Sequence, residues 1–156
     1  MKFTFGIVTG TKVDDIVLNS IYDLNIPEFE IIIVGGKAPI GYPKLTHIPF
    51  DESQQQNWIT KKKNIITEHA KYDNIVFMHD YLVFNKEWYN GFKKFGNDFD
   101  ICMNVIKNLD GSRFRDWCAW DDPDINYPYG GVTTGSGENH RNTIKNNLCI
   151  FQEHIG

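Results

Sequence analysis

Short apolar runs separated by polar segments predict the strands of a sheet. The clearest runs are rich in β-branched and aromatic residues and span residues 3–9, 29–34, 45–49 and 74–78. Within residues 29–34, four successive β-branched residues indicate burial on both faces, which is typical of a parallel sheet. We also expect a short strand at residues 81–84 and another at residues 99–106.

Apolar residues at helical spacing predict helices between these strands, at residues 16–26, 57–71 and 86–95. In the first, Ile16, Val17, Ile21 and Leu24 recur at this spacing, and Pro27 ends the helix. The alternation of strands and helices predicts an α/β domain with a mostly parallel sheet. Such a sheet binds ligands beyond the carboxyl ends of its strands.

Three polar or glycine-containing pairs follow the predicted strands, at the edge where a ligand is expected. They are Thr9-Gly10, Gly35-Gly36 and His79-Asp80. Glycines at Gly35 and Gly36 would let a ligand approach the backbone closely, or they would simply form a turn. No GxGxxG or GxxxxGK[ST] pattern occurs in the chain, so the dinucleotide-binding and P-loop interpretations lose support.

His79-Asp80 is the strongest candidate for metal chemistry. A carboxylate at the end of a buried strand can hold Mg²⁺ or Mn²⁺, and the cation in turn holds a diphosphate. One aspartate suffices when phosphate oxygens complete the coordination shell, and His79 would be a second ligand or would hydrogen-bond a ribose. The alternative is that Asp80 caps a turn and His79 is an ordinary polar residue.

Two further segments carry charged side chains that could contact the phosphates, base or ribose of a nucleotide. Lys61, Lys62 and Lys63 would meet phosphate near a helix start, although a lysine triplet is more often a solvated face. Asp51 follows a predicted strand and would accept a hydrogen bond from a nucleobase or ribose, although such an aspartate more often begins a turn.

The character of the chain changes after residue 107. We expect residues 1–107 to form an α/β domain, and residues 108–156 to form a loop region and irregular tail of the same domain. A cluster of arginine, aspartate and tryptophan begins this second part. Tryptophan faces stack on sugars, and aspartate can act as general base toward a hydroxyl. The alternative is a structural hairpin with surface ion pairs.

Composition narrows the class of protein. The chain has 156 residues and a net charge of −4, which argues against a nucleic-acid coat, and 14% of its residues are aromatic. Its three cysteines are widely spaced and form no CxxC pair, which argues against a zinc ribbon and predicts reduced thiols. Reduced thiols are typical of a cytoplasmic protein, which we therefore expect. No apolar run is long enough for a transmembrane segment.

The pattern resembles the nucleotide-sugar glycosyltransferases with the GT-A fold, particularly family-2-like ones. The segments FTFGIVTG, VLNSIYDL, EIIIVGG, KKKN and NIVFMHDYLVF carry the resemblance, which covers roughly residues 3–106. Lys63-Asn64 occupies the place of the family's Arg/Lys-Asn pair, and His79-Asp80-Tyr81 occupies the place of its DxD motif. Because histidine and tyrosine stand here in place of the acidic residues of the motif, Asp80 is the only carboxylate left at it.

The resemblance implies a three-layer sandwich and a metal-dependent, inverting transfer of a sugar from a nucleoside diphosphate sugar to a glycan or other hydroxyl acceptor. It implies nucleotide-sugar binding by Thr9, Gly10, Gly35, Asp51, Lys63, Asn64, His79 and Asp80, with the metal at Asp80. A general base would come from Asp116, Asp121 or Asp122, and Arg115, Trp117 and Trp120 would bind the acceptor. A shortened, non-catalytic nucleotide- or glycan-binding module is the alternative, and a nucleotidyltransferase is a weaker one.

Overall fold

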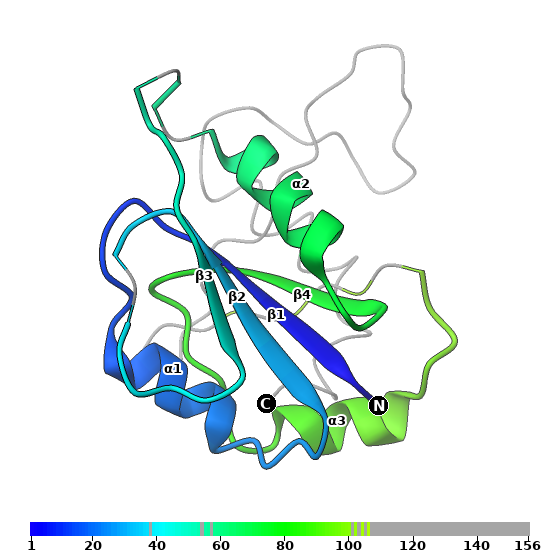
Figure 1. Cartoon of the computed structure of the whole chain (residues 1–156). Coiled ribbons are helices and arrows are strands. Elements are labelled where there is room, and N and C mark those ends of the chain that lie inside the picture. The colour runs from blue at the N-terminus through cyan, green and yellow to red at the C-terminus, as the bar shows by residue number, and fades with distance from the viewer. Residues whose placement is uncertain are drawn as a thin grey trace, which may run out of the picture. The chain divides into compact units, whose positions relative to one another are not determined.

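The computed structural model describes residues 1–37, 39–53, 55–56, 58–100, 102, 104 and 106. The first four predicted strands and the three predicted helices occur in the predicted order, and their bounds differ from the predicted ones by a few residues at most (Figure 1). In chain order they are β1 (Phe3–Val8), α1 (Asp15–Tyr22), β2 (Phe29–Val34), β3 (Leu45–Ile48), α2 (Ile59–His69), β4 (Asn74–His79) and α3 (Trp88–Phe95).

The four strands form one parallel sheet in the order β3-β2-β1-β4. The central strand β1 pairs in register with both neighbours, so that Val8 lies opposite Val34 on one side and opposite His79 on the other. The α/β class and the parallel sheet expected from the sequence are therefore confirmed.

Helix α2 packs closely on one face of the sheet because β1 carries a glycine there. A Cβ at Gly6 would lie 2.5 Å from Cγ2 of Ile66, so a larger residue would push the helix away. Ile66 forms a buried cluster with Val8, Ile32 and Val34. The absence of a side chain at Gly6 thus sets the distance between α2 and β1.

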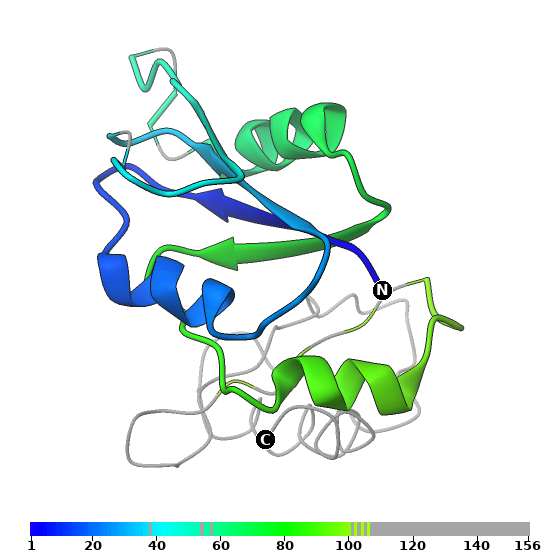
Figure 2. The ribbon, with the colours of Figure 1, turned by 60° about the horizontal axis from the view of Figure 1, so that its bottom comes forward.

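The other face of the sheet is covered by α1, as Figure 2 shows, so α1 and α2 lie on opposite faces. Because side chains alternate along a strand, Phe3, Phe5 and Ile7 point away from α2, and all three are buried. The ring of Trp88 lies 5.3 Å from that of Phe3 and 5.8 Å from that of Phe5, measured between centroids. Val17, Leu18 and Ile21 form the buried side of α1.

Some details of the sequence-based prediction are wrong. Residues 81–84 are not a strand, because the backbone turns at once after β4 and the amide of Leu82 donates to the carbonyl of His79 at 3.3 Å. Ile16 was expected on the inner side of the first helix but is 68% exposed. Of the strand expected at 99–106, the structure describes 99, 100, 102, 104 and 106, and none of these belongs to a strand.

The chain divides into two units, Met1–Tyr89 and Asn90–Gly156. Within the second unit, the rings of Phe92, Phe95 and Phe99 contact one another at centroid distances of 5.4 to 6.4 Å. The domain division expected after residue 107 lies outside the described residues. No helix in the part of the chain that the structure describes is both long and apolar enough to cross a membrane.

Candidate functional site

The structure brings together the three strand ends that the sequence singled out. Since Val8 pairs with both Val34 and His79, the residues that follow, Thr9, Gly35 and Asp80, begin the loops beyond three adjacent strands. The backbone amide of Thr9 donates to the carbonyl of Val34 at 3.2 Å, which continues the pairing of β1 with β2 past the strand. These loops form one edge of the sheet.

Thr9 and Asp80 are joined directly across this edge. The Thr9 hydroxyl donates to Oδ2 of Asp80 at 2.5 Å, and the backbone amide of Thr11 donates to the same hydroxyl oxygen at 3.0 Å. Thr9 is buried, so the carboxylate is held by a side chain that is itself fixed. The contact lies between β1 and β4, beyond the carboxyl ends of these two neighbouring strands. Open parallel sheets bind ligands at this position.

Asp80 fits a cation that is held mostly by its ligand. Among the described residues, no three His, Cys, Asp or Glu side chains are grouped as a metal cage would require. Mg²⁺ and Mn²⁺ need few protein ligands when phosphate oxygens and water complete the shell, and one carboxylate at a strand end meets that requirement. Asp80 could therefore serve as a ligand of a cation that arrives with a diphosphate.

His79 lies beside Asp80 and stacks on Tyr81, with ring centroids 5.4 Å apart and planes inclined by 6°. Burial lowers the pKa of His79, the nearby positive charge of Lys63 lowers it further, and the charge of Asp80 opposes both. Its imidazole is therefore neutral at pH 7, with one nitrogen able to donate a hydrogen bond and the other able to accept one.

Lys63 and Asn64 lie on α2, and they differ in exposure. Lys63 is half-buried, its Nζ lies 5.6 Å from the ring centroid of Phe77, and burial lowers its pKa. Asn64 is exposed. The effect of Lys63 on His79 shows that these two predicted residues share one environment at the end of β4.

Gly35 and Gly36 are required by the packing of the chain itself. Gly35 has a φ of 89° and Gly36 a φ of 61°, a region that favours glycine. A Cβ at Gly35 would lie 2.3 Å from the carbonyl oxygen of Thr9, and one at Gly36 would lie 1.7 Å from that of Thr11. The close approach that the sequence suggested is thus between two loops of the protein. Gly10, in contrast, has open space around it.

Asp51 begins a turn, as its alternative interpretation held. Its Oδ1 accepts a hydrogen bond from the backbone amide of Ser53 at 2.9 Å, and the bonds from Ser53 lower the pKa of the carboxyl. The side chain is exposed and ionised at neutral pH, so the turn leaves it free to accept a further hydrogen bond from a ligand.

Lys62 is buried at this edge, a position that neither interpretation of the lysine triplet predicted. It is only 3% exposed, and its Nζ donates to the carbonyl of Thr9 at 2.7 Å and forms an ion pair with Glu52. The lysine triplet suggested a solvated face, yet the spacing of Lys62 from its apolar neighbours indicates that it lies on the buried side of the helix. Trp58, Lys62 and Ile66 are each four residues apart, which places them on one stripe of a helix.

The predicted catalytic and acceptor-binding residues lie outside the described residues. They are Arg115, Asp116, Trp117, Trp120, Asp121 and Asp122. Their roles stay predictions from the sequence.

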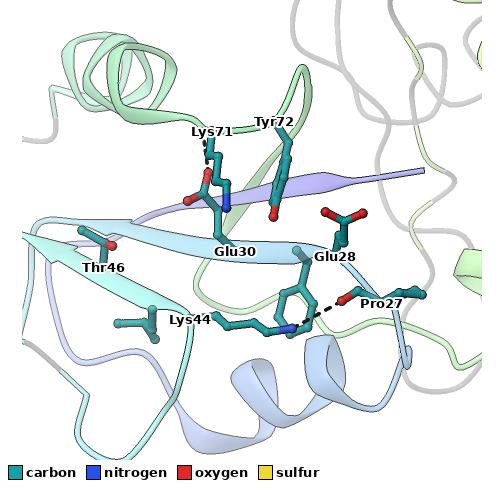
Figure 3. Close-up of a pocket in the computed structure, with 9 residues that line it drawn as sticks. Pro27, Glu28, Glu30, Lys44, Thr46, Lys71 and Tyr72 are labelled. Carbon is teal, nitrogen blue, oxygen red and sulfur yellow. Dashed lines mark hydrogen bonds between the residues drawn. The ribbon is translucent and has the colours of Figure 1, made fainter.

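A hollow of about 440 Å³ lies at the opposite edge of the sheet, by the amino ends of β2 and β3 (Figure 3). Its charged groups are engaged within the protein. Glu30 accepts hydrogen bonds from the Lys71 amide at 2.6 Å and the Thr4 hydroxyl at 2.7 Å, and the Lys44 ammonium lies 4.5 Å from the ring centroid of Phe29. No residue predicted to bind a ligand lines this hollow.

Comparison of the chain with protein-family models, with curated proteins and with solved structures found no match. The functional conclusion therefore rests on the strand ends. They combine an oriented carboxylate, a neutral histidine and a half-buried lysine, with a second carboxylate at Asp51 on the loop after β3. Carboxylates are ligands that divalent cations prefer, and a lysine ammonium is a common phosphate contact.

Proposed function

We propose that this protein binds a nucleoside diphosphate sugar across the carboxyl ends of β1, β2 and β4, and that it is a glycosyltransferase-like protein with a three-layer GT-A sandwich. The contact between the Thr9 hydroxyl and Asp80 Oδ2 carries the proposal. It orients a carboxylate at the point where open parallel sheets bind ligands, at the position that resembles the DxD motif of that family.

In this proposal, Asp80 holds Mg²⁺ or Mn²⁺, and the bound cation supplies positive charge that stabilises the departing diphosphate. Thr9 keeps the Asp80 carboxylate in place. His79, neutral at pH 7, hydrogen-bonds a ribose hydroxyl or joins Asp80 as a ligand, and Lys63 and Asn64 lie toward the phosphates. Asp51 accepts a hydrogen bond from the nucleobase or ribose. Gly10, which has open space around it, brings the backbone of its loop to the ligand.

The proposed reaction is a direct displacement at the anomeric carbon. The oxygen of an acceptor hydroxyl forms a bond to that carbon while the bond to the diphosphate breaks, which inverts the configuration. Asp116, Asp121 or Asp122 takes the proton of the hydroxyl as general base, and Arg115, Trp117 and Trp120 hold a glycan or other acceptor.

A non-catalytic module that binds a nucleotide or a glycan is the second candidate. The lone carboxylate at the end of β4 favours it, because a site with one acidic ligand holds its cation less firmly than one with two. Slow release of nucleoside diphosphate from bound UDP-sugar or GDP-sugar distinguishes the two. Binding with no release over many hours would support the module and contradict the enzyme.

Calorimetric titration with UDP and GDP, first with Mn²⁺ and then with EDTA, tests the proposal. We expect one of the two nucleotides to bind in the presence of Mn²⁺ and binding to be lost in EDTA, because the cation links Asp80 to the diphosphate. Failure of both nucleotides to bind under either condition would overturn the proposed function.

A further inference from the structure

The buried ammonium of Lys62 has no part in the scheme above, although it lies beneath the strand ends. It contacts two different segments of the chain. One is the carbonyl of Thr9, which accepts from Nζ at 2.7 Å. The other is the loop after β3, where Glu52 forms an ion pair with the ammonium and the ring centroid of Phe50 lies 5.0 Å from it.

Asp51 lies between the two loop residues that Lys62 contacts. Phe50 also packs against the buried cluster formed by β1, β2 and α2, while Glu52 is tied to the ammonium. With both neighbours anchored on one group, the backbone at Asp51 is fixed from both sides. Its own carboxylate, bonded to the amide of Ser53, remains exposed to solvent.

A purely structural role is a poor explanation for this arrangement. Removing a lysine ammonium and a carboxylate from water costs free energy, and well-packed apolar residues in place of a buried ion pair are often neutral or stabilising. An apolar residue at 62 would also continue the apolar stripe of Trp58 and Ile66. What the charge adds is a specific connection between the end of β1 and the loop that carries Asp51.

We propose that Lys62 is a positioning residue for nucleoside recognition, which holds the loop after β3 so that Asp51 meets the base or ribose of the ligand. This inference rests on the proposed function. Asp80 and its cation would bind the diphosphate at the end of β4, and Asp51 would bind the nucleoside at the loop after β3. Lys62 should therefore affect mainly the nucleoside half of the ligand, because the bond from the Thr9 amide to the Val34 carbonyl holds Thr9 beside Asp80 without Lys62.

The experiment compares Lys62→Met with Lys61→Met, since Lys61 is the adjacent, exposed lysine of the same helix. UDP, GDP and inorganic pyrophosphate are each titrated in the presence of Mn²⁺. For Lys62→Met we expect about tenfold weaker binding of the nucleotide that the wild type binds, the loss typical of a supporting residue, and pyrophosphate binding within about twofold of wild type. Lys61→Met should match the wild type with every ligand.

Amide hydrogen exchange gives a second readout that does not depend on any ligand. Lys62→Met should speed exchange at the Ser53 amide, whose bond to Asp51 depends on the held loop, and should leave the amides of β1 and β2 protected. Glu52→Gln, which keeps Lys62 bonded to Thr9, should produce the same pattern more weakly. It keeps the test decisive if Lys62→Met does not fold.

Equal weakening of the nucleotide and pyrophosphate would overturn the positioning role, and so would unchanged exchange at Ser53 in both variants. If the wild type binds pyrophosphate but neither nucleotide, the nucleoside role of Lys62 fails while a metal-diphosphate site stands. If the wild type binds none of these ligands, the proposed function fails and the nucleoside role fails with it. Hydrogen exchange then still decides whether Lys62 holds the loop.

Discussion

The two edges of the sheet differ in what their polar groups do. At the amino ends, the hollow is lined by charged side chains that contact one another, the backbone or an aromatic ring, as Figure 3 shows for Glu30 with Lys71. At the carboxyl ends, a buried threonine orients Asp80, and Asp51 stays exposed beside a loop anchored on Lys62. The amino edge has a hollow, whereas the carboxyl edge has polar side chains held in fixed positions.

This difference shows that a hollow alone is weak grounds for a binding site. The ion pair between Lys2 and Glu28 at the amino edge joins two side chains that are each more than half exposed, so it contributes little to stability and offers no fixed geometry to a ligand. Thr9, at 5% exposed, and Lys62, at 3%, are buried polar groups, and burial of such groups requires specific partners. The carboxyl edge is therefore the better candidate.

Of the proposed substitutions, Asp80→Asn should have the largest effect on nucleotide binding, and it tests the carboxyl edge directly. Because it removes the charge that holds the cation, we expect metal-dependent nucleotide binding to weaken by more than about 100-fold. Lys44→Met, at the amino edge, also removes one charge, of the opposite sign, and should leave binding within about twofold. Calorimetry measures both, and a strong effect of Lys44→Met with none for Asp80→Asn would reverse the assignment.

Gly36→Ala should destabilise the fold because two loops meet at the carboxyl edge without spare room. The new Cβ would overlap the Thr11 carbonyl at 1.7 Å, with φ at 61°. Gly41→Ala is the control, since Gly41 has a similar φ of 88° and open space around it. We expect the overlap to make Gly36→Ala about 2 kcal/mol more destabilising than Gly41→Ala in urea unfolding. Equal costs would mean that the loops can separate freely.

Thr9→Val removes the hydroxyl that donates to Asp80 and keeps the shape of the side chain. We expect nucleotide binding in Mn²⁺ to weaken about tenfold, the lower end of what loss of such a supporting partner costs. Thr46→Val, on the exposed side of β3 beside the hollow, should change nothing measurable by calorimetry. Unaltered affinity in Thr9→Val would show that Asp80 needs no orientation.

The smallest expected effect is a shift in the pKa of His79. Its pKa in the folded, metal-free protein lies below the ordinary value of 6.5, so the folded state binds fewer protons than the unfolded state between these two values. The contribution of His79 to stability is therefore present above pH 6.5 and is lost as pH falls through the folded pKa. Lys63→Met should raise this pKa, seen by NMR titration of the imidazole, while Lys61→Met should not. A fall in the pKa of His79 in Lys63→Met would contradict the described environment.

Much of the fold could be predicted because strand signals were local. The run from Ile31 to Val34 marked a strand buried on both faces, and the order of elements was enough to place Thr9, Gly35 and Asp80 at one edge. The contact between Thr9 and Asp80 could not be predicted, because it depends on β1 and β4 being neighbours, which only the sheet order determines.

The burial of Lys62, the packing of the two glycines and the turn after β4 were not evident from the sequence, because the first two depend on contacts between distant residues. The lysine triplet looked uniform, yet the buried stripe of α2 separates Lys62 from exposed Lys61. Gly35 and Gly36 suggested room for a ligand, whereas their closest neighbours are the carbonyls of Thr9 and Thr11. Continuation of a strand after Asp80 was wrong because apolar residues there follow a turn closed by His79 and Leu82.

Mapping the bound nucleotide by NMR tests the central claim most directly. Titration of the labelled protein with UDP or GDP and Mg²⁺, which avoids paramagnetic broadening, reports which backbone amides respond. The account predicts shift changes that cluster at Thr9, Gly10, Gly35, His79 and Asp80 and that disappear when EDTA removes the cation. Shift changes concentrated instead at Glu28, Glu30, Lys44 and Tyr72, around the hollow at the amino edge, would contradict it.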